Sequence, residues 1–170
     1  MSSLVVMGVA GCGKSSLGAA LANALGWPLI EGDDFHPESS RAKMRAGIAL
    51  TDADRRSWLS TLAAELAGRP DAILTCSALK QGYRDQLRAA ASGLRFVFLD
   101  LSEAAALERV AQRPAHLFPP TLVASQFATL ERPDGEPGVL RVDATLAPAA
   151  LLNQVLAWLG APSNHTPSKP

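Results

Sequence analysis

The sequence lacks an excess of charge of either sign, a set of paired cysteines and any long hydrophobic run. Its 170 residues carry 16 Lys and Arg against 16 Asp and Glu, so the formal net charge is zero. Balanced charge disfavours nucleic-acid and membrane-surface binders, whose affinity rests on bulk positive charge. It leaves room for a locally basic pocket within a neutral protein.

The few cysteines and the short apolar runs exclude further classes. Two cysteines, Cys12 and Cys76, are too few for a disulfide framework. No apolar run reaches the roughly 18–20 residues that cross a bilayer. Residues 1–12 look like an export signal, but the stretch is short and no basic residue precedes Lys14. We therefore expect a cytoplasmic protein with no membrane partner and no nucleic-acid partner.

Length and composition favour a single folded domain. At about 150 residues per domain, the chain has room for one, and its 48% hydrophobic content is that of a globular protein. We expect this domain over residues 1–160. Residues 161–170 contain three prolines and no hydrophobic periodicity, which predicts a disordered tail.

Strand and helix patterns alternate along the chain. Short apolar runs predict strands at Leu4–Met7, Pro28–Glu31, Ala72–Cys76, Arg95–Leu101 and Val139–Val142. Helical spacing covers 14–25, 39–46, about 52–68, 81–91, 102–112, 121–130 and 148–159. This order predicts an α/β fold in three αβα layers, with a five-stranded parallel sheet between helices. Ligands should then bind at the carboxyl ends of the strands.

A phosphate-binding loop follows the first strand. Residues 8–15, GVAGCGKS, match the pattern G-x-x-x-x-G-K-[ST], with a strand before and a helix after. Its glycines let backbone N–H groups turn toward phosphate oxygens, and the following helix adds its positive end. Lys14 would reach the β- and γ-phosphates, and Ser15 would offer its hydroxyl to Mg²⁺. The predicted ATP-binding set is Gly8, Gly11, Cys12, Gly13, Lys14, Ser15 and Ser16 of this loop, together with Arg109.

The loop alone leaves several enzyme classes open. A GTPase would normally carry an Asn-Lys-x-Asp guanine-binding motif, which the chain does not contain. A motor or transporter ATPase is usually a much larger chain. These exclusions leave a small kinase that acts on a nucleotide or a metabolite.

Acidic residues at strand ends are the candidates for metal binding and proton transfer. Asp100 ends an apolar strand, but the strand count places it beyond the strand that normally neighbours a phosphate loop. We therefore interpret Asp100 as a capping residue. Asp33 and Asp34, directly after the second strand, are better placed.

Several further sequence motifs resemble those of a known family. They are Gly32-Asp33-Asp34-Phe35-His36-Pro37, Lys43-Met44-x-x-Gly47, Leu50-Thr51-Asp52-x-Asp54-Arg55, Trp58-Leu59, Cys76-Ser77-Ala78-Leu79-Lys80, Tyr83-Arg84-Asp85-x-Leu87-Arg88 and Ser125-Gln126-Phe127-x-x-Leu130-Glu131. With the phosphate loop, they resemble the gluconokinase family of small sugar-acid kinases from about Val5 to Val142. Departures at Ala49, Ser57 and residues 116–119 affect loop stiffness more than chemistry.

The resemblance implies an activity, a cofactor and an assembly. Members of this family use ATP and Mg²⁺ to phosphorylate the 6-hydroxyl of D-gluconate, and they are commonly homodimers. It also implies a substrate-binding segment at about 36–68 and a lid at about 109–125. The substrate-binding residues that follow are Asp33, His36, Lys43, Ser77, Lys80, Arg84, His116 and Gln126.

The chemistry of gluconate suggests roles for some of these residues. A sugar acid needs cations for its carboxylate and polar groups for its hydroxyls. Lys80 and Arg84 are four residues apart, share a helix face, and are predicted to bind the carboxylate, chiefly through Arg84. Arg45 and Arg88 are expected on solvated helix faces. The cations would thus gather at the phosphate loop, at 80–84 and in the lid.

The predicted catalytic residues are Lys14, Asp33, Arg109 and Arg113. Asp33 would accept the proton of the attacking hydroxyl or orient it, and would contact Mg²⁺ through water. Arg109 and Arg113 would close over the phosphates from the lid. The role of Asp34 stays open, and the loop 143–148 is expected to hold the adenine.

Two alternatives stay open at this point. The first is a kinase of another small hydroxy acid, such as a shikimate-like acceptor, on the same scaffold. The second is a nucleotide-binding module without transfer activity, which would bind ATP but release no ADP in response to an acceptor.

Overall fold

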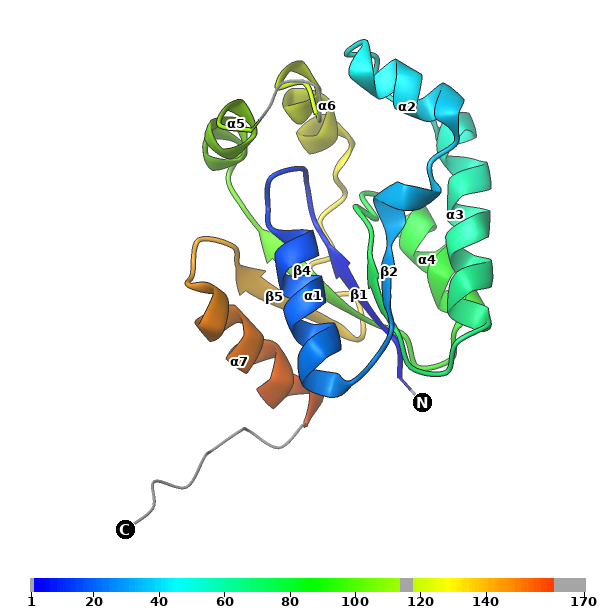
Figure 1. Cartoon of the computed structure of the whole chain (residues 1–170), viewed down its shortest axis with the longest axis vertical. Coiled ribbons are helices and arrows are strands. Elements are labelled where there is room, and N and C mark those ends of the chain that lie inside the picture. The colour runs from blue at the N-terminus through cyan, green and yellow to red at the C-terminus, as the bar shows by residue number, and fades with distance from the viewer. Residues whose placement is uncertain (1, 114–117, 161–170) are drawn as a thin grey trace.

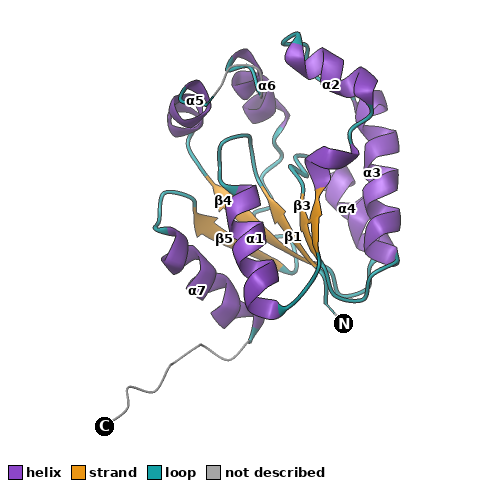
Figure 2. Cartoon of the chain, viewed as in Figure 1, coloured by secondary structure: helices purple, strands orange, loops and turns teal. Residues whose placement is uncertain are grey.

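The computed structural model describes residues 2–113 and 118–160, and its centre is a parallel sheet (Figure 2). The strands are β1 (Leu4–Met7), β2 (Leu29–Glu31), β3 (Ile73–Thr75), β4 (Arg95–Asp100) and β5 (Val139–Asp143). Their order across the sheet is β2-β3-β1-β4-β5, and every neighbouring pair is parallel. The predicted α/β class and five-stranded parallel sheet are confirmed.

Helices cover both faces of the sheet (Figure 1). They are α1 (Lys14–Leu25), α2 (Glu38–Arg45), α3 (Asp52–Ala67), α4 (Gln81–Ala90), α5 (Glu103–Ala111), α6 (Thr121–Thr129) and α7 (Pro148–Leu159), with a 3₁₀ turn η1 (Gly32–Phe35) after β2. α1 and α7 lie on one face, and α3 and α4 lie on the other. α2 and α6 lie beyond the carboxyl ends of the strands.

The central strand separates two hydrophobic cores. All four residues of β1 are buried, which is why the strand is a continuous apolar run. Leu4 and Val6 join the core beneath α1 and α7. Val5 and Met7 face the opposite way and join the core beneath α3 and α4. This alternation fixes the register of β1, because a slip of one residue would exchange the two faces.

The end of β4 corrects one inference. The sequence predicts that the strand ending in Asp100 lies beyond the neighbour of the phosphate-loop strand. This prediction is wrong, because β4 pairs directly with β1. Asp100 is nonetheless engaged elsewhere: it accepts hydrogen bonds from Arg132 and from Arg141 Nε, the latter at 2.7 Å. The bonds from Arg132 are the main reason that the pKa of Asp100 lies below its usual value. The capping role also fails, since Ser102 caps α5 by accepting from the N–H of Ala105.

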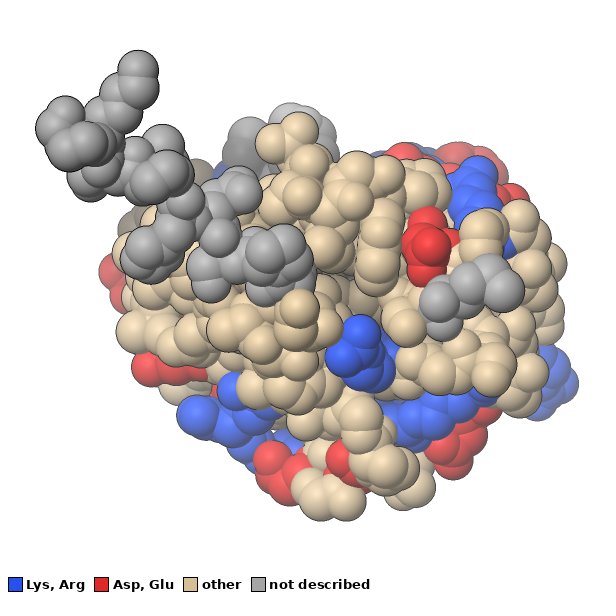
Figure 3. Space-filling view, turned by 90° about the horizontal axis from the view of Figure 1, so that it is seen from below, with Lys and Arg blue, Asp and Glu red and all other residues tan. Residues whose placement is uncertain are grey.

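The face seen in Figure 3, which is opposite the carboxyl ends of the strands, is mostly uncharged, with side chains of both signs toward its lower and right-hand edges. In residues 2–113 and 118–160, no helix is long and apolar enough to cross a membrane. The predicted disordered tail, 161–170, lies outside the described residues.

Candidate active site

The phosphate loop is shaped by glycines whose backbone conformation other residues rarely adopt. Gly8 has φ 150°, and a Cβ there would lie 2.7 Å from Cys12 Sγ and 2.9 Å from the carbonyl oxygen of Leu99. Gly13 has φ 96° and begins α1 without a side-chain cap. The first N–H groups of α1 are therefore not satisfied by a capping side chain. They form a ready site for an anion.

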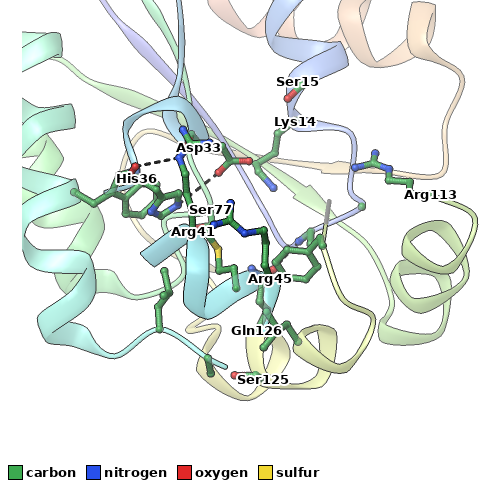
Figure 4. Close-up of a pocket in the computed structure, with 18 of the residues that line it drawn as sticks. Lys14, Ser15, Asp33, His36, Arg41, Arg45, Ser77, Arg113, Ser125 and Gln126 are labelled. Atoms are coloured by element: carbon green, nitrogen blue, oxygen red, sulfur yellow. Dashed lines mark hydrogen bonds and ion pairs between the residues drawn. The ribbon is translucent and has the colours of Figure 1, made fainter. Parts of the chain in front are cut away.

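Lys14 and Ser15 lie at the mouth of this loop. Lys14 Nζ donates to the carbonyl oxygens of Gly8 and Val9, at 3.0 and 3.1 Å. Lys14 and Ser15 both line a cavity of about 470 Å³ between the loop, η1, α2 and α6 (Figure 4). Ser15 Oγ donates to the carboxylate of Glu31 at 3.1 Å. The sequence reasoning missed Glu31, although its place two residues before Asp33 at the end of a strand was a usable signal.

The turn η1 presents Asp33 to the same cavity. Trp58 Nε1 donates to the carbonyl oxygen of Gly32 at 2.8 Å, and Arg41 Nη2 donates to the carbonyl oxygens of Asp33 and Asp34. A Cβ on Gly32 would lie 2.2 Å from the carbonyl oxygen of Thr75, so the turn packs directly on β3. Its backbone is thus fixed while the Asp33 side chain remains 81% exposed. Asp34 does not line the cavity.

His36 lies in the wall of the cavity as a buried ring. It stacks on Trp58 with 4.2 Å between ring centroids and 15° between planes. Burial is the main cause that lowers its pKa, and the charges of Arg41 and Arg55 act in the same direction against the opposing effect of Asp33. His36 is therefore neutral at pH 7. Its Nδ1 is buried without a partner among the described residues.

Three arginines from the helices after η1 line the cavity: Arg41, Arg45 and Arg55. Arg41 is used largely in holding η1, and Arg45 pairs with Glu38. Arg55 is only 9% exposed and donates to the hydroxyl of Tyr83 at 3.4 Å. Within the described part of the chain, Arg55 has no carboxylate partner. Sequence reasoning missed Arg41. Arg45 is exposed, as expected from the sequence, although it also lines the cavity.

Lys43 and Lys80, both predicted to bind substrate, are paired away from the cavity. Lys43 Nζ lies 2.9 Å from the carboxylate of Asp54. This contact, together with the stronger bond from the N–H of Thr51, lowers the pKa of Asp54 to about 2. Lys80 Nζ lies 3.0 Å from Asp52. Neither lysine lines the cavity, so the geometry gives no support to their predicted roles.

Arg84, the residue favoured for the substrate carboxylate, is buried inside the protein. Its side chain is 0% exposed and lies 2.6 Å from the carboxylate of Glu136. It also donates to the carbonyl oxygens of Ala78 and Glu131, both at 2.8 Å. All its bonds go to protein atoms, and it does not line the cavity. The structure contradicts a substrate-binding role for Arg84, because no face of the guanidinium is open.

The predicted nucleotide end forms a second cavity of about 470 Å³, which shares Gly11, Gly13, Ser16 and Arg113 with the first. Arg109 Nη1 donates to the carbonyl oxygen of Gly11, and its Nη2 donates to that of Ala144. Arg109 therefore joins the phosphate loop to the loop after β5. It lines the second cavity rather than the first, whereas Arg113 lines both.

The cysteines differ in their surroundings. Cys12 lines the second cavity from within the phosphate loop. Burial raises the pKa of Cys76 to about 12, so this thiol stays protonated and unreactive.

The remaining predicted residues come from two further segments. Ser77 lines the first cavity, as does Gln126 on α6. The side-chain oxygen of Gln126 accepts from the N–H of Ala10 in the phosphate loop at 2.6 Å. His116 lies outside the described residues.

The sheet order, the phosphate loop and the two joined cavities define a phosphate-loop kinase. The solved structure of shikimate kinase from Aquifex aeolicus has the same fold: the TM-score is 0.59 at 17% identity, over 94% of this chain and 96% of that one. A family model described as an AAA domain matches residues 4–133. The chain therefore has the fold of a phosphate-loop kinase.

Proteins with higher sequence identity to this chain identify its family. A gluconokinase from Gluconobacter oxydans is 41% identical over 157 residues, which cover 90% of this chain and 88% of that protein. The thermosensitive gluconokinase of Escherichia coli is 38% identical over 83% of this chain and 78% of its own length. The crystal structure of a gluconokinase from Sinorhizobium meliloti matches with a TM-score of 0.87 at 47% identity, over 94% and 91% of the two chains. This chain belongs to the gluconokinase family.

Proposed function

We propose that this protein transfers the γ-phosphoryl group of ATP to the 6-hydroxyl of D-gluconate, forming 6-phospho-D-gluconate and ADP. One observation carries the proposal beyond the family names. A single cavity is lined by Lys14 of the phosphate loop, by the exposed carboxylate of Asp33 and by the buried Arg55. These groups suit a phosphate donor, an alcohol acceptor and a carboxylate on the acceptor.

Arg55 is the best candidate for the gluconate carboxylate. A buried guanidinium without an acidic partner is costly, and a bound carboxylate would neutralise it through charge-assisted hydrogen bonds. Arg41 and Arg45 line the same wall and add positive potential. The neutral His36 and the hydroxyl of Ser77 supply polar contacts for the hydroxyl groups of the sugar acid.

Asp33 is the group that faces the reacting hydroxyl. As the 6-oxygen of gluconate bonds to the γ-phosphorus, the bond from that phosphorus to the β,γ-bridging oxygen breaks and ADP leaves. The proton of the hydroxyl passes to the carboxylate of Asp33 and then to solvent. Because phosphoryl transfer has a loose transition state, Asp33 acts mainly by orienting the hydroxyl. Lys14 and Arg113 offset the negative charge on the phosphates.

Mg²⁺ suits the oxygen-rich corner beside the phosphate loop. Ser15 Oγ and the carboxylate of Glu31 lie 3.1 Å apart there, and Mg²⁺ prefers a few protein oxygens together with phosphates and water. Ser15 and Glu31 would hold the ion, with Asp33 reaching it through water. When bound, Mg²⁺ neutralises charge on the phosphates.

Other parts of the proposal rest on the family resemblance. We assign substrate binding to the segment 36–68 and a closing role to the segment 109–125, with Arg109 serving the nucleotide end. A homodimer and a cytoplasmic location also remain predictions.

An acceptor panel tests the function. With ATP and Mg²⁺ present, we expect ADP release to depend on D-gluconate and not on shikimate or nucleoside monophosphates. Asp33→Asn should lower kcat strongly while ATP binding, measured by calorimetry, stays close to wild type. Turnover with shikimate instead would favour the first alternative. ATP binding without any acceptor-dependent release would favour a non-catalytic module.

A further inference from the structure

Gln126 connects α6 to the phosphate loop. The two segments are far apart in the sequence, yet the side-chain oxygen of Gln126 accepts from the N–H of Ala10 at 2.6 Å. Gln126 is half-buried. Both residues line the first cavity, which also contains Lys14 and Asp33 (Figure 4). Gln126 thus lies where the phosphate site meets the acceptor site.

The bond to Ala10 fixes the orientation of the carboxamide. A backbone N–H can only donate, so the oxygen of Gln126 must face the phosphate loop and the NH₂ group must point away from it. Within residues 2–113 and 118–160, no acceptor bonds to Nε2. Nε2 is also not among the buried polar atoms that lack a partner in the described residues, so it is accessible, and its residue lines the cavity. The cavity therefore holds an uncharged, pre-oriented pair of hydrogen-bond donors.

The hydrogen bond between Gln126 and Ala10 of the phosphate loop indicates which ligand the NH₂ group contacts. Most groups that surround the proposed sugar-acid site, such as Arg55 and His36, come from the segment from η1 to α3, and Ser77 follows β3. Gln126 is attached instead to the loop that holds the phosphates. The oxygens of a transferring phosphoryl group are acceptors that carry charge through the transition state. A fixed donor near such oxygens stabilises the transition state without having to reorganise.

We propose that Gln126 is a catalytic residue that donates from Nε2 to the transferring phosphoryl group, held in place by the N–H of Ala10. This proposal rests on the proposed kinase function. It assigns to Gln126 a contact with the phosphoryl group, in place of the sugar-acid contact expected from the sequence.

The substitution Gln126→Glu removes the NH₂ donor of the side chain while keeping the oxygen that accepts from Ala10. A glutamate can still accept from the N–H of Ala10, but it presents an anionic oxygen where the NH₂ group was. We expect kcat with D-gluconate to fall by about 10²–10³-fold, the usual effect of losing one transition-state donor. The Kd for D-gluconate and the melting temperature should stay near wild type. Thr129→Ala is the matched control, because Thr129 is on α6, bonds to the carbonyl oxygen of Ser125 and lies outside the cavity.

Three results would overturn the proposal. Gln126→Glu could keep its kcat, or raise only the KM for gluconate, which would assign the donors to the sugar acid. It could also weaken ATP binding by the same factor as kcat, which would indicate a distorted phosphate loop. If wild-type protein shows no gluconate-dependent turnover, the proposed function fails first, so the two failures are distinguishable.

Discussion

Replacing Arg84 by alanine should damage stability rather than substrate affinity. The side chain is fully buried, and its partner Glu136 is 10% exposed. Removing one member of a buried ion pair costs about 3–5 kcal/mol, because the remaining charge stays buried. Here Arg88 also contacts Glu136 at 2.9 Å and would remain. We therefore expect the lower end, about 3 kcal/mol.

The carbonyl oxygens of Ala78 and Glu131 would lose a donor in the same variant. Ala78 has φ 46°, in the left-handed region that alanine rarely adopts. Its backbone lies between Ser77, which lines the first cavity, and the start of α4. Arg84 therefore holds a strained turn in place as well as pairing with Glu136. For this reason we expect the loss of unfolding free energy in Arg84→Ala to be larger than that for breaking a surface ion pair.

Thermal unfolding followed by circular dichroism measures the effect. For a chain of this size, about 3 kcal/mol corresponds to a fall in Tm of about 6–12 °C. Arg88→Ala is the control: it shares Glu136 but is 21% exposed, and we expect a loss of about 1 kcal/mol. At a temperature where both proteins are folded, the KM of Arg84→Ala for gluconate should stay within a few-fold of wild type. An unchanged Tm with a greatly raised KM would refute the reasoning and restore Arg84 as a carboxylate ligand.

Two further predictions concern the walls of the first cavity. Arg55→Met should raise the KM for gluconate by about 10–100-fold, since hydrogen bonds to charged groups contribute roughly 1.5–3 kcal/mol. The control Arg56→Met changes an exposed neighbour and should leave this KM unchanged. Equal effects of the two variants in steady-state kinetics would contradict the assignment of Arg55. The lowered pKa of His36 means that unfolded chains take up a proton below about pH 6.5 while the folded protein does not, so the free energy of unfolding should fall as pH drops from 7 toward 5.5. His36→Phe keeps a ring against Trp58 and should show a smaller fall in urea titrations, and an identical pH dependence would show that His36 is not the group responsible.

Most of the fold was predictable because its signals are local. The buried runs of the parallel sheet are continuous and apolar, so all five strands were found, with ends within about one residue. The start of α3 was predicted at about residue 52, and there Thr51 and Asp54 form a reciprocal cap, in which each side chain accepts from the other's backbone N–H. The phosphate loop was recognised because its spacing and its flanking strand and helix occur together.

The substrate wall was harder to predict because it depends on which helix face turns inward. The four-residue spacing of Lys80 and Arg84 shows that they share a face, but not whether that face meets a ligand, solvent or the protein interior. Arg84 is held by Glu136, some fifty residues away, and no local pattern reveals this pairing. The same limit hid Arg41. Many of the charged side chains are therefore paired with one another, and among the buried residues that the structure describes, Arg55 is the cation without a carboxylate partner.

The measurement that tests the central claim most directly follows the phosphoryl group itself. Purified protein is incubated with ATP, Mg²⁺ and D-gluconate, and the products are observed by ³¹P NMR. We predict that the γ-phosphate signal of ATP is replaced, mole for mole, by ADP and a phosphomonoester coupled to the C6 protons of gluconate. Bound ATP that remains intact in the presence of gluconate, or phosphate that appears only as the free ion, would contradict the account.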